Sequence, residues 1–147
     1  MTQARPLLVR LRNFVGDTVL SLPALRLLQE RGYRLELLGK GWAHSLLEAE
    51  GWPVHVRPEG LRERVAQLRA LRRRFALEDP GFDGRSNLLL FPYAFSAALD
   101  ARLAGLRAEG HAGEGRSWLL RRAHPRREAR HALVEYWELA CNFLGIQ

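Results

Sequence analysis

Hydrophobic and polar positions along this 147-residue chain alternate between short apolar runs and longer segments with helical spacing. Short runs bounded by glycine, proline or charged residues are typical of strands, and they lie at residues 7–11, 34–38, 54–57 and 88–91. The helical segments begin after the turn-like stretch 12–17 and continue at residues 42–50, 61–75, 95–103 and 128–144. We expect one further short strand and a loop within residues 105–116.

Two of these helices carry additional detail. The first reaches Gln29 and contains Pro23, which predicts a kink; the alternative is a regular helix that begins near Ser21 with Pro23 in its first turn. The third has an arginine-rich outer face and an apolar face. The apolar positions are Leu61, Val65, Leu68, Leu71 or Arg72, and Phe75.

This alternation of strands and helices predicts an α/β fold, a Rossmann-like and mainly parallel sheet with helices on both faces. The length predicts a single domain that extends from residue 1 to residue 147. Ligands bind such sheets at the C-terminal ends of the strands. The loops of interest are therefore residues 12–17, 39–41, 57–60 and 92–95.

The charge balance predicts an anionic partner. Lysine and arginine together number 23 against 16 acidic residues, a net charge of +7, and every basic residue except Lys40 is arginine. Codon use is one explanation for the preference for arginine over lysine, but it does not explain the excess of positive charge. Nucleic acid, anionic lipid and a phosphorylated sugar are all anionic partners that would match this positive charge. No apolar stretch approaches the roughly 20 residues of a membrane span, so we expect a cytoplasmic protein.

Metal and cofactor sites are not expected. The single cysteine, Cys141, cannot close an intramolecular disulfide and is interpreted as a buried helical residue. The five histidines share no metal-ligand spacing. The first loop has one glycine, Gly16, where a dinucleotide-binding turn needs three.

The first loop instead ends in Gly16-Asp17, and Leu22-Pro23-Ala24-Leu25 follows in the next helix. With residues 8–12, this opening resembles that of the heptosyltransferases, the family-nine glycosyltransferases of lipopolysaccharide core assembly. The resemblance continues in order through Phe91-Pro92, Phe95 with Ala98-Leu99, residues 110–116 with Leu119-Leu120, and His131 with Glu135-Tyr136 and Leu139-Ala140. The last group resembles the family's interdomain helix.

The resemblance implies the N-terminal, acceptor-side half of a GT-B glycosyltransferase. In that family the N-terminal half holds the lipid-linked sugar acceptor, and the C-terminal half binds ADP-heptose. The implied reaction is transfer of heptose, with inversion, to the lipopolysaccharide inner core. The family's donor-binding Asp-Thr-Gly has no counterpart before Gln147, so we expect the donor-binding domain to be absent and the chain to be inactive without it. Residues 93–96 also depart from the Asn-Ser-Phe-Lys often found in heptosyltransferase II.

The resemblance assigns Asp17 as the catalytic base, which removes the proton of the acceptor hydroxyl. The alternative is a plain helix N-cap, worth about 0.5 to 2 kcal/mol. Gly16 is interpreted as allowing close approach of the sugar, or as supplying a positive φ. The other candidate acceptor-binding residues are the arginines Arg12, Arg62, Arg69, Arg73 and Arg116, for which a solvated surface position is the alternative.

Two other classes of protein satisfy parts of the pattern: a basic nucleic-acid-binding module and a non-catalytic glycan-binding α/β module. No zinc-finger, RNA-recognition or helix-turn-helix motif supports the first, so no nucleic-acid partner is expected. The expected partners are a lipid-linked sugar acceptor, ADP-heptose when a C-terminal domain is supplied, and an anionic membrane in peripheral contact.

Overall fold

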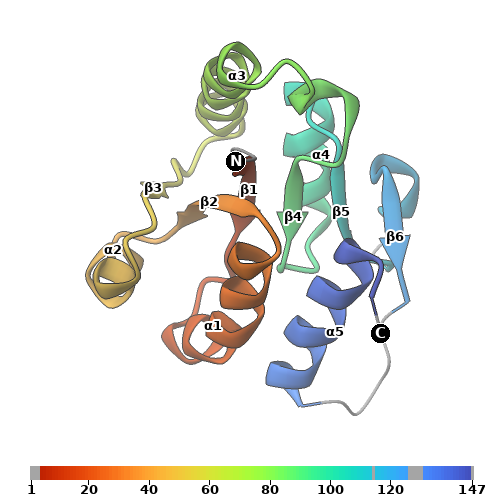
Figure 1. Ribbon diagram of the computed structural model, residues 1–147. Coiled ribbons are helices and arrows are strands. Elements are labelled where there is room, and N and C mark those ends of the chain that lie inside the picture. The colour runs from red at the N-terminus through yellow and green to blue at the C-terminus, as the bar shows by residue number, and fades with distance from the viewer. Residues whose placement is uncertain (1–3, 114, 126–130, 147) are drawn as a thin grey trace.

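The computed structural model describes residues 4–113, 115–125 and 131–146, in which strands and helices alternate (Figure 1). The strands are β1 (Arg5–Arg10), β2 (Tyr33–Gly39), β3 (Val54–Val56), β4 (Leu88–Leu90), β5 (Ala108–His111) and β6 (Arg122–His124). The helices are α1 (Val15–Glu30), α2 (Trp42–Leu47), α3 (Leu61–Glu78), α4 (Phe95–Ala104) and α5 (Ala132–Leu144). Short 3₁₀ turns lie at Glu48–Glu50, Phe82–Gly84 and Ser117–Leu119.

The six strands form one sheet in the order β3-β2-β1-β4-β5-β6, and every neighbouring pair is parallel. The predicted α/β fold is therefore confirmed, with a sheet that is entirely parallel within the described residues. The chain first builds outward from β1 to β3 and then returns through α3 to place β4 on the other side of β1 (Figure 1). This reversal brings the C-terminal ends of β1 and β4 together.

Two hydrophobic cores lie on opposite faces of the sheet because successive strand residues point to opposite sides. Leu7 and Val9 of β1 pack with α1, α2 and α5, whereas Leu8 packs with α3 and α4. The prediction of helices on both faces is confirmed. All three side chains are fully buried, as expected for a strand covered on both faces.

Helix α1 runs from Val15 to Glu30 with Pro23 inside it, so the alternative in which the regular helix begins near Ser21 is wrong. A kink at Pro23 stays a prediction. In α3 the buried residues are Val65, Leu68, Leu71 and Phe75, which settles the choice between Leu71 and Arg72. Leu61, by contrast, is 43% exposed and does not belong to the apolar face as predicted.

The sequence pattern did not predict β6, a three-residue edge strand with the sequence Arg-Ala-His. It has no apolar run. Its backbone pairs with β5, with Arg122 opposite Glu109, and the His124 side chain contacts the buried Glu109 carboxylate at 2.7 Å. The predicted final helix begins at Ala132 among the described residues. Residues 128–130 of that prediction, and Glu114 of the glycine-spaced segment, lie outside the described residues.

Candidate active site

The reversal of strand order places a hollow at the C-terminal ends of β1 and β4. In open parallel sheets this switch point is where ligands bind, since the two flanking loops diverge from it. The hollow measures about 230 Å³ and is lined by Arg12, Asn13, Phe14, Asp17, Pro92, Tyr93 and Ala94. Two of the four loops selected from the sequence, residues 12–17 and 92–95, thus meet here.

Asp17 lies in the first turn of α1, at the third helical position, with Phe14 at the N-cap. No side chain caps this helix end, so the interpretation of Asp17 as an N-cap is wrong. Its Oδ1 accepts a hydrogen bond from the Tyr136 hydroxyl at 2.8 Å and one from Arg12 Nη1 at 3.4 Å. Both of these contacts use Oδ1, and Asp17 is one of the residues that line the hollow.

Tyr136 belongs to α5, 119 residues after Asp17 in the sequence. It was not predicted as a site residue. Burial raises the pKa of its hydroxyl far above the usual range, and the hydrogen bond to Asp17 acts in the same direction. Tyr136 therefore stays a neutral donor at physiological pH. It holds the Asp17 carboxylate in one orientation.

Arg12 lies between two aromatic rings. Its guanidinium carbon is 3.9 Å from the Tyr93 ring centroid and 5.4 Å from that of Tyr136. Nε also donates to the Phe91 carbonyl at 3.4 Å, while Nη2 is buried without a hydrogen-bond partner among the described residues. Stacking fixes the plane of a guanidinium, so Arg12 presents a defined positive charge beside Asp17.

Helix α5 joins the two loops that form the hollow. The Tyr136 hydroxyl binds Asp17 of the first loop's helix, and the Tyr93 hydroxyl of the second loop donates to Glu135. Because adjacent residues of one helix hold both sides, the positions of the two loops are coupled. The only sequence signal for this role was the resemblance of residues 135–136 to the family's interdomain helix.

Arg116 is fully buried and does not reach the hollow. Its guanidinium donates to the carbonyl oxygens of Pro92 at 2.8 Å, Ala94 at 3.1 Å and His111 at 3.0 Å. It therefore connects the β4–α4 loop to the end of β5. This geometry positions the loop and leaves the side chain closed to a ligand from solvent.

Gly16 has no positive φ, so that interpretation of the glycine is wrong. A Cβ built at Gly16 meets no atom within 4 Å, which means that this part of the first helical turn is open. Phe14, beside it, is 71% exposed at the rim of the hollow. An exposed ring next to an open backbone offers an apolar surface to a ligand in the hollow.

A buried charge cluster lies beside the hollow on the α3–α4 side of the sheet. Asp100 of α4 is fully buried and accepts from Arg10 at 2.9 Å and from Arg64 at 2.7 Å. Burial lowers the pKa of Arg57 to about 10, and the charges of Arg10 and Arg64 act in the same direction. Arg57 in turn binds Asn13 of the first loop. One carboxylate thus faces three guanidinium groups, and the net charge here is positive.

The remaining predicted residues, Arg62, Arg69 and Arg73, are exposed on α3 and do not line the hollow. The structure therefore brings together Arg12, Gly16 and Asp17 but not the other four candidates. No group of three or more His, Cys, Asp or Glu side chains suited to a metal ion occurs in residues 4–113, 115–125 and 131–146. Nor does any described helix have the length and apolar character needed to cross a membrane.

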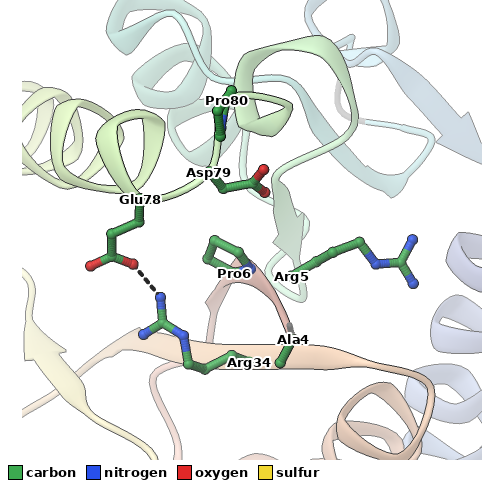
Figure 2. A pocket seen from close by; sticks show the side chains of 7 residues that line it. All are labelled: Ala4, Arg5, Pro6, Arg34, Glu78, Asp79 and Pro80. Atoms are coloured by element: carbon green, nitrogen blue, oxygen red, sulfur yellow. Dashed lines mark hydrogen bonds and ion pairs between the residues drawn. The ribbon is translucent and has the colours of Figure 1, made fainter. Parts of the chain in front are cut away.

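A second hollow, of about 620 Å³, lies at the opposite edge of the sheet (Figure 2). It is formed at the start of β1 and β2 and after α3, with Arg34 paired to Glu78 across it. The Arg5 side chain extends away from Arg34 and Glu78 (Figure 2). Because parallel sheets bind ligands at the C-terminal ends of their strands, the smaller hollow beside Asp17 is the candidate site.

Comparison with known proteins agrees with this fold. No family model and no curated protein matches the sequence. Among solved structures, E. coli heptosyltransferase WaaC with ADP-2-deoxy-2-fluoro heptose matches 97% of this chain with a TM-score of 0.65 and 19% identity. Acinetobacter baumannii MurG matches 85% of this chain with a TM-score of 0.55 and 16% identity.

The chain spans about half the length of these proteins, 49% of the WaaC chain and 47% of the MurG chain. Its fold is that of one half of a GT-B glycosyltransferase, as predicted. The chain is similar to a heptosyltransferase and to MurG. Sequence identities of 19% and 16% show that the fold is shared, and nothing finer.

Proposed function

We propose that this chain is the acceptor-binding domain of a GT-B heptosyltransferase that acts on the lipopolysaccharide inner core at the cytoplasmic face of the membrane. The observation that carries the proposal is the Asp17 carboxylate, held by Tyr136 at the switch point of the sheet. The resemblance of Gly16-Asp17 and Leu22-Pro23-Ala24-Leu25 to the family's opening supports the same assignment.

In the proposed reaction the acceptor hydroxyl binds beside Asp17 Oδ2. Its oxygen forms a bond to the anomeric carbon of heptose as the bond from that carbon to the diphosphate breaks, which inverts the configuration. The proton passes to the Asp17 carboxylate, and the electron pair of the broken bond leaves with ADP. A second domain would bind ADP-heptose and face this hollow.

The neighbouring residues act on the acceptor or on the base. Tyr136 orients the carboxylate, and the Arg12 guanidinium, which lines the hollow, supplies positive charge for an acceptor oxygen. The open backbone at Gly16 lets the sugar approach closely. Arg116 acts indirectly, because it holds the β4–α4 loop in place. The exposed arginines Arg62, Arg69 and Arg73 would contact phosphates of the lipid portion, outside the sugar site.

The proposal predicts acceptor binding without turnover. Calorimetric titration should show that the chain binds a phosphorylated inner-core glycan, and Arg12→Met should weaken binding about tenfold because it removes a charged donor. ADP-heptose alone should bind far more weakly, and the two substrates together should give no product. Equally tight binding of ADP-heptose, or efficient transfer by the chain alone, would contradict the assignment to the acceptor side.

Substitution of Gly16 by alanine should separate stability from binding. Alanine favours the helix and meets no neighbour within 4 Å, so the free energy of unfolding should rise by up to about 1 kcal/mol. The added methyl group would occupy the face left open for the sugar, so glycan affinity should fall. Gly41→Ala is the matched control, since that glycine also has open space and lies outside the hollow. Unchanged glycan affinity in Gly16→Ala would refute close approach at this residue.

A further inference from the structure

Tyr93, in the loop between β4 and α4, is contacted through both its ring and its hydroxyl group. The Arg12 guanidinium carbon lies 3.9 Å from the ring centroid. The ring of His111, at the end of β5, packs edge-to-face against Tyr93 with the two centroids 5.3 Å apart. The Tyr93 hydroxyl donates to the Glu135 carboxylate of α5. Three segments that are distant in the sequence therefore converge on one side chain, although that side chain is only partly buried.

The backbone on either side of Tyr93 is held as well. The buried Arg116 donates to the Pro92 carbonyl at 2.8 Å and to the Ala94 carbonyl at 3.1 Å. A tyrosine side chain has only two torsion angles, so a fixed backbone and a bonded hydroxyl leave its ring little freedom. The ring of Tyr93, which lines the hollow, is therefore held in one orientation.

Arg12 has weaker contacts apart from this ring. Its hydrogen bonds to the Phe91 carbonyl and to Asp17 are both 3.4 Å long, beyond the usual range of about 2.7 to 3.2 Å. The Tyr136 ring centroid is 5.4 Å away, close to the limit of about 6 Å for a cation–aromatic contact. Tyr93 is the closer of the two rings. A long side chain loses much rotamer freedom when it is fixed, so the close stack decides where the charge lies.

We propose that Tyr93 is a positioning residue, whose ring holds the Arg12 guanidinium beside Asp17. Glu135 acts on Arg12 only through the Tyr93 hydroxyl, which places the charge of the site under the control of α5. The inference rests on the proposed function, which takes Arg12 to act on an acceptor oxygen. Neither Tyr93 nor Glu135 needs to touch the acceptor for this role.

The alternative is a direct contact between Tyr93 and the acceptor, since the ring lines the hollow. The two roles differ in how they depend on Arg12. If Tyr93 acts through Arg12, removal of the ring has no further effect once the guanidinium is gone. If Tyr93 contacts the acceptor itself, the two losses add, because the contacts are independent.

The first test observes Arg12 directly, with no glycan and no sugar transfer. Heteronuclear NMR of the nitrogen-labelled full chain records the Nε–H signal, which the Arg12→Met spectrum assigns. Groups above the face of an aromatic ring are magnetically shielded, so Tyr93→Leu should move this signal downfield, and Tyr93→Phe should leave it in place. Arg5 is the internal control, since it lies over Tyr33 at 4.3 Å and its signal should not move. An Arg12 signal unchanged in Tyr93→Leu would overturn the proposal.

The second test is calorimetric titration with a phosphorylated inner-core glycan. Tyr93→Leu should weaken binding about fivefold, the value of one cation–aromatic contact. Tyr93→Phe keeps the ring and should lose less than about twofold. In the Arg12→Met background, Tyr93→Leu should cause no further loss. Additive losses would show that Tyr93 contacts the glycan itself and would overturn the positioning role.

Trp118→Leu is the control for removal of an aromatic ring. Trp118 is 73% exposed and does not line the hollow, so its loss should change neither the Arg12 signal nor the affinity for the glycan. A loss in Trp118→Leu equal to that in Tyr93→Leu would overturn the special role of Tyr93. Absence of glycan binding by the unsubstituted chain would contradict the proposed function, and the Arg12 signal would still decide whether Tyr93 holds the guanidinium.

Discussion

Asp100→Asn is expected to lower the free energy of unfolding by about 3 to 5 kcal/mol, because it removes the carboxylate that neutralises a buried arginine. The Asp100 side chain is fully buried and that of Arg10 is 8% exposed, so water cannot replace the lost partner. A domain is stable by about 5 to 15 kcal/mol, so the loss is a large part of the total. Urea denaturation monitored by circular dichroism measures it.

The control for this prediction is Asp83→Asn, which breaks an exposed pair with Arg72 and should cost less than about 1 kcal/mol. Combining Asp100→Asn with Arg10→Met should restore part of the lost stability, since the more buried of the two arginine partners of Asp100 is then uncharged, although Arg64 remains. A loss below about 1 kcal/mol in Asp100→Asn alone would mean that Arg10 does not depend on Asp100 for compensation.

For the proposed reaction, Asp17→Asn is expected to reduce heptose transfer by about 10² to 10⁴-fold when the chain is assayed with a donor-binding domain supplied. An amide keeps the size of the side chain and can still accept the Tyr136 hydrogen bond, but it cannot take a proton from the acceptor. Acceptor affinity and the unfolding midpoint should therefore change little. Product formation under single-turnover conditions separates this loss of chemistry from a loss of binding.

Tyr136→Phe provides the comparison. It removes one hydrogen bond to the carboxylate and keeps the base, so transfer should fall by only about tenfold. Near-normal heptose transfer by the Asp17→Asn variant would contradict the proposal that Asp17 is the base. Equal losses in the two variants would instead assign the effect of Asp17 to its contact with Tyr136.

The sequence was sufficient to predict the fold class, since short apolar runs and helical spacing are local properties of the chain. Apolar runs such as residues 88–91 indicated strands buried on both faces, and β4 is indeed fully buried. The sequence did not predict β6, because an edge strand needs no apolar run. Residues 122–124 form a strand by pairing with β5. Strand order was likewise not predictable, because it depends on pairing between distant residues.

Parts of the candidate site followed from the loops at the C-terminal strand ends, where Arg12, Gly16 and Asp17 were selected. Arg116 was selected because it lies in a segment that resembles the family, yet it is buried among backbone carbonyls. On α3, helical spacing located the outer face but could not show which arginines have carboxylate partners. Those partners, such as Asp100 and Asp83, come from other elements.

The sequence alone therefore predicted a mainly parallel α/β sheet and placed Asp17 at the C-terminal ends of its strands, because periodicity and turn residues act over short distances along the chain. Tertiary structure alone placed the Tyr136 hydroxyl 2.8 Å from Asp17, across 119 residues of sequence, and Arg12 between two tyrosine rings. It also turned α3 so that three of its arginines are neutralised and three are left exposed. Hydrogen bonds and ion pairs between elements depend on how those elements pack. A local sequence pattern does not contain that information.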